Sequence, residues 1–304
     1  MEETLVLRRV LSEGIEEQVA RLREQSLGKR LLELGVFGTL WGLGLWLSAS
    51  GHFWGIVFTV AALNAFVLLL HEGMHNTLFV NRWANDLLSA VLGSTVGISF
   101  TAYKIMHLRH HDFLGDERDP DDYHNYTASP RLVWFLHGAR VLCGSLMYLF
   151  LIPFYASRYA TSQEKARMMG EYAFIISVYA ALLSRLEGAQ FFALHGAPLL
   201  LVGWLVNLRG FTQHGLAVAE DPLLASRSVH AHPVVAFLLL NENFHLEHHL
   251  FPEIPSYNLL KLHKLIWPRL PRAVKNDSYS EFLLASLKQA THLDESPIGI
   301  VEKS

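Results

Sequence analysis

The sequence predicts an all-α integral membrane protein, a helical bundle with about four transmembrane helices in two hairpins, interfacial helices and a cytosolic, histidine-rich cap. Three observations predict this fold class. Hydrophobic residues make up 51% of the 304 residues and charged residues only 17%, a balance that favours a membrane protein. Two long stretches carry few or no charges, and the 17 histidines gather in a few short clusters.

The first hairpin is predicted between Leu34 and Leu70, where no charged side chain occurs. One span needs about 20 residues, so this stretch accommodates two spans that turn at residues 48–52, where Ser, Gly and His gather. A second hairpin is predicted from about Met168 to Asn207, turning near residues 184–188, with a shorter first arm.

The remaining sequence divides into a short N-terminal segment, the membrane domain and a tail. Residues 1–30 alternate charged and apolar side chains, which indicates either a membrane-surface amphipathic helix or an ordinary solvated helix. Residues 31–276 form the membrane domain, and residues 277–304 form a C-terminal tail, either a soluble cap or partly disordered. The Arg-rich N-terminus and the basic residues between 261 and 275 are expected on the cytoplasmic side, which requires an even number of crossings.

Charge and cysteine content exclude several classes of function. The net charge of −3 offers no broad basic face for nucleic acid. Cys143 is the single cysteine, so an intrachain disulfide or a cluster of thiolates is excluded. Any metal must therefore use other ligands, and neutral imidazole is a common one.

Three histidine boxes stand out: HEGMH at residues 71–75, HLRHH at 107–111 and HLEHH at 245–249. Spacings of three and four residues place imidazoles on one face of a helix. The HxxHH pattern is expected roughly 0.05 times by chance in a chain of this composition, and it occurs twice. The boxes hold eight histidines, and His214 makes a ninth. Nine ligands suit two metal ions, of iron, copper or zinc rather than magnesium or calcium.

The sequence resembles the membrane fatty acid desaturase and hydroxylase superfamily from about His71 to Ile266. The resemblance rests on the three boxes, on Gln213-His214 after the second hairpin, and on the segment Pro255 to His263 that follows the third box. It implies a nonheme diiron centre, molecular oxygen as co-substrate, two external electrons and a fatty acyl substrate. Iron is therefore the expected metal.

Carried over residue by residue, the resemblance implies nine iron ligands: His71, His75, His107, His110, His111, His214, His245, His248 and His249. Asn207 and Asn243 are candidates for a further contact through water. The acidic residues near the boxes are expected to orient ligand imidazoles: these are Glu72, Asp112, Asp119, Asp121 and Glu247. The eight histidines outside this set are expected to be surface or hydrogen-bonded residues: His52, His124, His137, His195, His230, His232, His263 and His292.

A shared centre also constrains the path of the chain. Its ligands must reach one side of the bilayer, so the apolar stretches Leu87–Tyr103 and Val133–Ala156 are expected to lie in the interface or re-enter without crossing. The expected reaction is oxidation of an unactivated C–H bond, most simply introduction of a double bond into an acyl-lipid, acyl-carrier or acyl-CoA substrate. Electrons would come from an external ferredoxin or cytochrome b5 type donor, because neither a CxxC pair nor an HPGG segment is present.

Three other functions remain open on the sequence. A hydroxylase or ketolase of a fatty acyl or carotenoid substrate would use the same boxes. HEGMH also satisfies HExxH, the motif of zinc metalloproteases, in which glutamate is the general base. That alternative leaves HLRHH and HLEHH without a role. A noncatalytic scaffold is the third, and it predicts that replacing His110 or His248 changes nothing.

Overall fold

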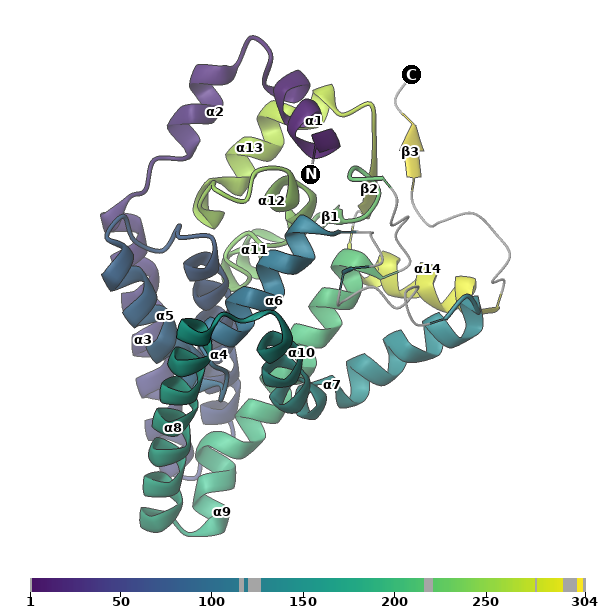
Figure 1. Cartoon of the computed structure of the whole chain (residues 1–304). Helices are drawn as coiled ribbons and strands as arrows, with labels where there is room; N and C mark the ends of the chain where they lie inside the picture. Colours follow the sequence, from purple (N-terminus) through teal and green to yellow (C-terminus); the bar gives the residue numbers. More distant parts are fainter. Residues whose placement is uncertain are drawn as a thin grey trace. The chain divides into compact units, whose positions relative to one another are not determined.

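The computed structural model describes residues 2–114, 118–119, 127–215, 221–276, 278–291 and 300–302. The chain divides into two compact units. We call Gln25–His107 with Cys143–Asn207 the spanning unit, and Met1–Glu24, Leu108–Leu142 and Leu208–Ser304 the box unit. Most described residues are helical (Figure 1), which confirms the predicted all-α class.

The spanning unit contains two helical hairpins. The first pairs α3 (Leu27–Ala49) with α4 (Trp54–Met74). The second pairs α8 (Ser162–Arg185) with a continuous run of α9 (Gly188–Phe191), the π-helix η2 (Phe192–Gly196) and α10 (Ala197–His214), whose last turns, from Leu208, belong to the box unit. These four helical stretches are long and apolar enough to cross a membrane. Both predicted hairpins are therefore confirmed, and the first arm of the second, at 24 residues, is longer than its apolar pattern indicated.

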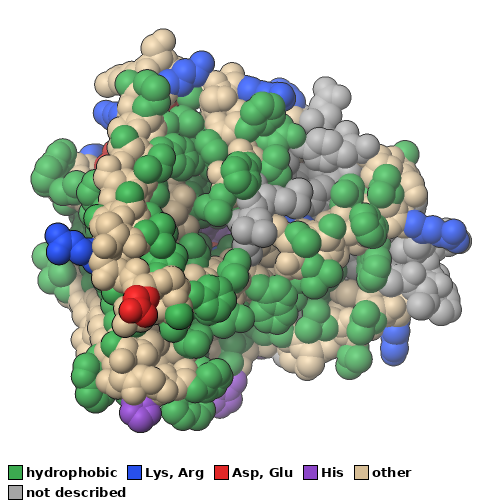
Figure 2. All heavy atoms as spheres, turned by 90° about the horizontal axis from the view of Figure 1, so that it is seen from below, with side chains coloured by type: hydrophobic (Ala, Val, Ile, Leu, Met, Phe, Trp, Pro, Cys, Tyr) green, Lys and Arg blue, Asp and Glu red, His purple; other side chains and the backbone are tan. Residues whose placement is uncertain are grey.

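The first hairpin packs tightly because small residues lie between its helices. A Cβ atom at Gly44 would come within 2.5 Å of Thr59 Oγ1, and one at Gly55 within 2.3 Å of the backbone nitrogen of Ser48. Small side chains of this kind let helix backbones approach closely in a membrane. In α4, 72% of the most apolar stretch is buried, compared with 11% in α3 and in α8. The exposed apolar side chains suit a lipid environment, and hydrophobic groups cover much of the face seen in Figure 2.

The first of the two apolar stretches predicted not to cross forms a bent pair of helices. α5 (Arg82–Thr95) and α6 (Phe100–Asp112) meet at 101°. Gly97, at the bend, has a φ of 73°, which glycine adopts without strain. α5 packs against α4 and α8. The second stretch lies in α7 (Pro130–Tyr159), and its course relative to a membrane stays a prediction.

The box unit joins both ends of the chain to the third histidine box. It contains α1 (Glu2–Ser12), α2 (Glu16–Leu22), α11 (Pro233–Leu238), α12 (His245–Leu250), α13 (Leu259–Ile266) and α14 (Tyr279–Thr291). Two 3-10 turns, η3 (Ser256–Asn258) and η4 (Trp267–Arg269), flank α13. A small sheet orders β1 (Arg227–Val229), β2 (Arg272–Asn276) and β3 (Ile300–Glu302), with β1 parallel and β3 antiparallel to β2.

The N-terminal segment differs from its prediction in two ways. It forms two helices, and their apolar face packs on protein: Leu11 and Val19 are buried in the core that includes residues of α12 and α13. The Asn258 side chain donates to the Leu22 carbonyl at 2.8 Å. The predicted boundary at residue 30 falls inside α3, because Ser26 caps that helix by accepting from the Lys29 N–H.

The C-terminal tail is also part of the box unit. Phe282 of α14 is fully buried, 5.2 Å from the ring of Phe211, and β3 pairs with β2. The sequence predicted neither this docking nor the sheet.

Candidate metal centre

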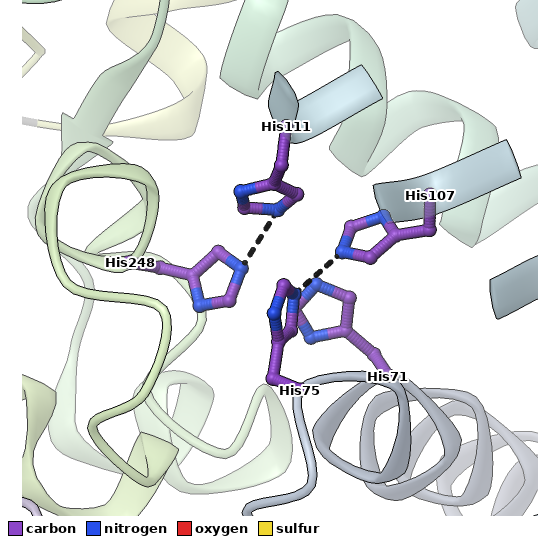
Figure 3. Close-up of side chains that lie close together, drawn as sticks. All are labelled: His71, His75, His107, His111 and His248. Carbon is purple, nitrogen blue, oxygen red and sulfur yellow. Dashed lines mark hydrogen bonds between the residues drawn. The ribbon is translucent and has the colours of Figure 1, made fainter. Parts of the chain in front are cut away.

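The first group of box histidines lies in the spanning unit. His71 lies in the last turn of α4, His75 is the C-cap residue of that helix, and His107 belongs to α6. Their ring centroids are 4.5 to 5.2 Å apart, and Nε2 of His75 lies 2.8 Å from Nε2 of His107 (Figure 3). Since His75 and His107 meet, the chain between them, with α5 and the bend into α6, returns to the end of α4. Its course relative to a membrane stays a prediction.

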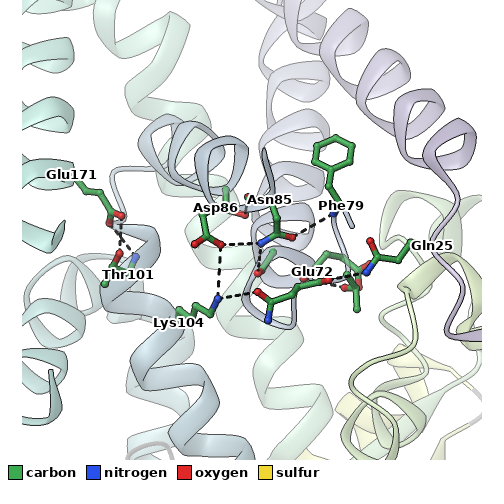
Figure 4. Close-up of polar contacts among 12 residues, drawn as sticks. Gln25, Glu72, Phe79, Asn85, Asp86, Thr101, Lys104 and Glu171 are labelled. Atoms are coloured by element: carbon green, nitrogen blue, oxygen red, sulfur yellow. Dashed lines mark hydrogen bonds and ion pairs between the residues drawn. The ribbon is translucent and has the colours of Figure 1, made fainter. Parts of the chain in front are cut away.

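The backbone around HEGMH is held by close packing and amide contacts. A Cβ atom at Gly73 would lie 1.8 Å from Ser89 Oγ of α5, so only glycine fits there. The carbonyl of Gly73 accepts from the buried Asn85 side chain at 2.9 Å. Asn76, which follows His75, has a φ of 58° and accepts through Oδ1 from Lys104 of α6 (Figure 4). These contacts fix the end of α4 where two ligand candidates lie.

Glu72, between the two histidines of the first box, forms an ion pair with Arg30. Arg30 and Glu72 are 1% and 2% exposed, and Arg30 also donates to Glu33 and to the Thr77 carbonyl. A general base must have an oxygen available to take a proton from the reacting group. One oxygen of the Glu72 carboxylate is engaged by a buried guanidinium, whereas the glutamate of a metalloprotease must accept a proton from the reacting group.

The second group of box histidines lies in the box unit. One imidazole nitrogen from each of His110, His214 and His249 lies within 4.8 Å of the others. His245 joins them: its Nε2 is 2.9 Å from Nε2 of His214 and 3.1 Å from Nε2 of His249. Helices α6, α10 and α12 supply these four residues. Converging imidazole nitrogens are the arrangement that a transition metal binds.

His111 and His248 complete the set. Their Nε2 atoms are 3.3 Å apart (Figure 3), and the His111 ring stacks on His249 with centroids 4.1 Å apart. All nine predicted ligands therefore lie against other box histidines, three in the spanning unit and six in the box unit. Helix α6 carries members of both groups.

Hydrogen bonds fix which nitrogen faces the cluster. Nδ1 of His214 lies 3.1 Å from the Ala225 carbonyl, which can only accept, so Nδ1 carries the proton and Nε2 presents a lone pair. Nδ1 of His110 lies 3.0 Å from both oxygens of the buried Asp119. Burial lowers the pKa of His249 well below its ordinary value, and its histidine neighbours lower it further. For His249, the lowered pKa favours the neutral imidazole that binds metal.

The other acidic residues near the boxes differ in whether they contact a box imidazole. Asp119 orients His110 in the predicted way, whereas Glu247 contacts Ser228 and His263 rather than a box imidazole. Asp112 is exposed, and Asp121 lies outside the described residues. Sequence reasoning missed Glu242, which is 1% exposed and 3.5 Å from Nδ1 of His245. Its position three residues before His245 is the signal that could have found it.

The two asparagine candidates are both buried, each with 2% exposure. Asn207 donates to the Gly203 carbonyl at 2.8 Å, and Asn243 donates to the Val229 carbonyl at 2.9 Å. The side-chain oxygen of each has no hydrogen-bond partner among the described residues. Both therefore retain an acceptor that a water molecule could bridge.

The histidines outside the nine are mostly surface or hydrogen-bonded residues, as predicted. His52, His230 and His232 are exposed, and His195 bonds to Tyr179 at 2.7 Å. His137 is buried beside Phe211. His124 and His292 lie outside the described residues. His263 is buried and bonded to Glu247 within the third box.

The donor set fits a transition metal. It consists of imidazoles, two of which have a carboxylate or carbonyl partner at the second ring nitrogen, and it suits iron, copper or zinc more than magnesium or calcium.

Comparison with known proteins gives consistent matches. The model of the family described as "Fatty acid desaturase" matches residues 48–280. Sphingolipid delta(4)-desaturase DES1 of Mus musculus is 26% identical over 228 residues, and that of Gallus gallus 28% over 233. Sphingolipid delta(4)-desaturase/C4-monooxygenase DES2 of Mus musculus is 27% identical over 230 residues. Each match covers 70% of this chain and 65% of the relative.

Proposed function

The chain belongs to the fatty acid desaturase family, and from that premise we propose that it oxidises an unactivated C–H bond of a lipid. The proposed reaction is the introduction of a double bond into a long acyl chain. The observation that carries the proposal is the convergence of box histidines, with His110, His214 and His249 within 4.8 Å of one another through their ligand atoms.

We propose that all nine histidines hold two iron ions. Nine ligands exceed the number that one ion accepts, and α6 supports a single centre because it carries His107 and, one turn further on, His110 and His111. When bound, a pair of iron ions would supply the activation of molecular oxygen that attack on such a C–H bond requires. The protein's own contribution is to hold the imidazoles in place, as Asp119 does for His110 and the Ala225 carbonyl for His214.

The substrate is proposed to come from the bilayer. The outer helices of the spanning unit expose apolar side chains such as Leu32, Trp46 and Ile176, so a lipid has direct access to their surfaces. The histidine boxes are proposed to face the cytoplasm, since the basic residues of the N-terminal and C-terminal segments favour that side. Acyl-lipid, acyl-carrier and acyl-CoA substrates all fit this proposal.

The two electrons that desaturation with oxygen consumes are proposed to come from an external ferredoxin or cytochrome b5 type protein. The exposed Lys261 and Lys264 of α13 are candidate contacts for an acidic donor, as are Arg158, Lys165 and Arg167.

Hydroxylation is the second candidate, favoured by the printed name of one relative. DES2 of Mus musculus is called both a desaturase and a C4-monooxygenase. A site of this kind would yield an alcohol wherever the carbon centre left by the first hydrogen removal is captured by hydroxyl.

The test is expression in a host that lacks the activity, followed by mass spectrometry of extracted acyl lipids and sphingolipids. We expect a new product two hydrogens lighter than its precursor, or one oxygen heavier if hydroxylation prevails. His248→Ala should abolish the product, whereas His52→Ala, at an exposed turn outside the boxes, should leave it unchanged. A product from His248→Ala at the level of the unmodified protein would contradict the proposal.

A further inference from the structure

Glu247 lies inside the third histidine box but is not one of the nine ligand candidates. It lies in α12 between ligand candidates, it is 0% exposed, and its side chain turns to other elements of the box unit. One oxygen accepts from Ser228 Oγ of β1, and the other lies 2.5 Å from Nδ1 of His263 of α13. A buried carboxylate needs such donors, because burial of a charge without partners is costly.

His263 is held as firmly as Glu247. It is 7% exposed, and its ring lies between Phe244, at 4.7 Å, and Trp267, at 5.0 Å, with interplanar angles of 36° and 31°. Its backbone belongs to α13, whose residues Leu259, Leu262 and Ile266 are buried in the core of the box unit. This packing therefore fixes the position of the His263 Nδ1 atom that contacts Glu247.

Helix α12, which carries Glu247, has little stability of its own. α12 has six residues, and isolated helices shorter than about 12 residues are marginal in water. Its rotation about its axis decides where His245, His248 and His249 point. Glu247 is the side chain of α12 that forms hydrogen bonds to both β1 and α13, so these bonds oppose rotation of α12.

We infer that His263 is a positioning residue that acts through Glu247 to fix the orientation of α12 and thus of three metal ligands. This inference rests on the proposed metal centre. His263 contacts none of the nine ligand candidates in any described hydrogen bond, and it holds the carboxylate that anchors their helix.

The test compares three substitutions in the full-length, iron-loaded protein. His263→Asn keeps an N–H donor close to the position of Nδ1, His263→Gln moves the donor toward the position of Nε2, and His263→Leu removes it. The readouts are iron retained per chain during titration with a chelator, turnover per bound iron, and thermal unfolding of the metal-free protein.

We expect His263→Leu and His263→Gln to retain iron about 10–100-fold less tightly than the unmodified protein, the usual cost of losing a partner behind the metal ligands. His263→Asn should restore most of that retention. In a double-mutant cycle, Glu247→Gln combined with His263→Leu should cost less than the sum of the two, because both remove one interaction.

Two results would overturn the inference. One is wild-type iron retention in His263→Leu. The other is equal loss of iron and of metal-free thermal stability in all three variants, Asn included, which would make His263 a packing residue. Absence of iron from the unmodified chain would instead overturn the proposed metal centre itself, so the two failures are distinguishable.

Discussion

At the scale of single residues, the site depends on groups that set the proton position of each imidazole. Asp119 forms a hydrogen bond with Nδ1 of His110, and the Ala225 carbonyl forms one with Nδ1 of His214. The Nε2 atom of each imidazole therefore remains available to the cluster. A carboxylate behind an imidazole also raises its basicity as a ligand. The chemistry of the centre is therefore shared between the boxes and residues outside them.

Asp119→Asn is expected to weaken iron binding about 10–100-fold, because the neutral amide no longer polarises the His110 imidazole. Chelator competition on the purified protein measures this loss. Asp112→Asn is the matched control, since Asp112 is exposed on the same helix as His110. Equal iron retention in the two variants would show that Asp119 does not support His110.

Gly73→Ala is expected to destabilise the protein by about 1–3 kcal/mol, the typical cost of overpacking, because the new Cβ would lie 1.8 Å from Ser89 Oγ. Adding Ser89→Gly to this variant should restore its stability, because it removes the side chain that the new Cβ would contact. Gly38→Ala, in the interior of α3 where nothing lies within 4 Å of the new Cβ, is the control and should not destabilise the protein. Thermal unfolding in detergent is the measurement, and a fully stable Gly73→Ala would contradict the packing described.

At the scale of elements, helix α6 carries three ligand candidates and is capped by another helix. Glu171 of α8 accepts from Ser99 Oγ at 2.5 Å, from the Thr101 N–H at 3.0 Å and from Thr101 Oγ1 at 2.7 Å (Figure 4). A negative charge at a helix N-terminus is favourable, because the first backbone N–H groups have no partner within the helix. The second hairpin thus stabilises the start of the helix that bears the second box.

Glu171→Ala is therefore expected to lower stability by about 1–3 kcal/mol, because buried donors at the start of α6 lose their acceptor. Loss of turnover should accompany it as α6 frays. Glu164→Ala removes a carboxylate that accepts from the Thr161 N–H in the capping box of α8, and it should cost only about 0.5–1 kcal/mol. Thermal unfolding distinguishes them, and a larger loss for Glu164→Ala would contradict the capping role of Glu171.

At the scale of the whole molecule, four helical stretches among the described residues are long and apolar enough to span a bilayer, and they form two hairpins. We propose that both hairpins begin and end on the cytoplasmic side. Because Cys143 is the only cysteine, a Cys143→Ser background permits a clean accessibility map.

In that background, Ser50→Cys and Glu187→Cys, at the turns of the two hairpins, should react with an impermeant thiol reagent from outside the cytoplasm. Lys261→Cys, exposed on α13, should react only from the cytoplasmic side. Labelling of positions 50 and 187 from opposite sides would refute the arrangement.

The sequence predicted the features that arise from local patterns. Apolar length indicated both hairpins, helical spacing of imidazoles indicated the eight box histidines as ligand candidates, and the place of His214 just after the second hairpin added the ninth. The sequence did not predict contacts between segments that are separate along the chain, such as His263 with Glu247 and Phe282 with Phe211. Glu242 beside His245 is a local contact, three residues away, that sequence reasoning overlooked. The amphipathic pattern of residues 1–30 could not distinguish a membrane surface from a protein surface, because Leu11 and Val19 would be buried by either.

The proposed binding of two iron ions by the nine histidines can be tested by counting metal ions in the purified protein. We expect two irons per chain, with a marked loss of iron in His214→Ala and none in His52→Ala. A single zinc per chain, or an unchanged iron content after His214→Ala, would contradict it.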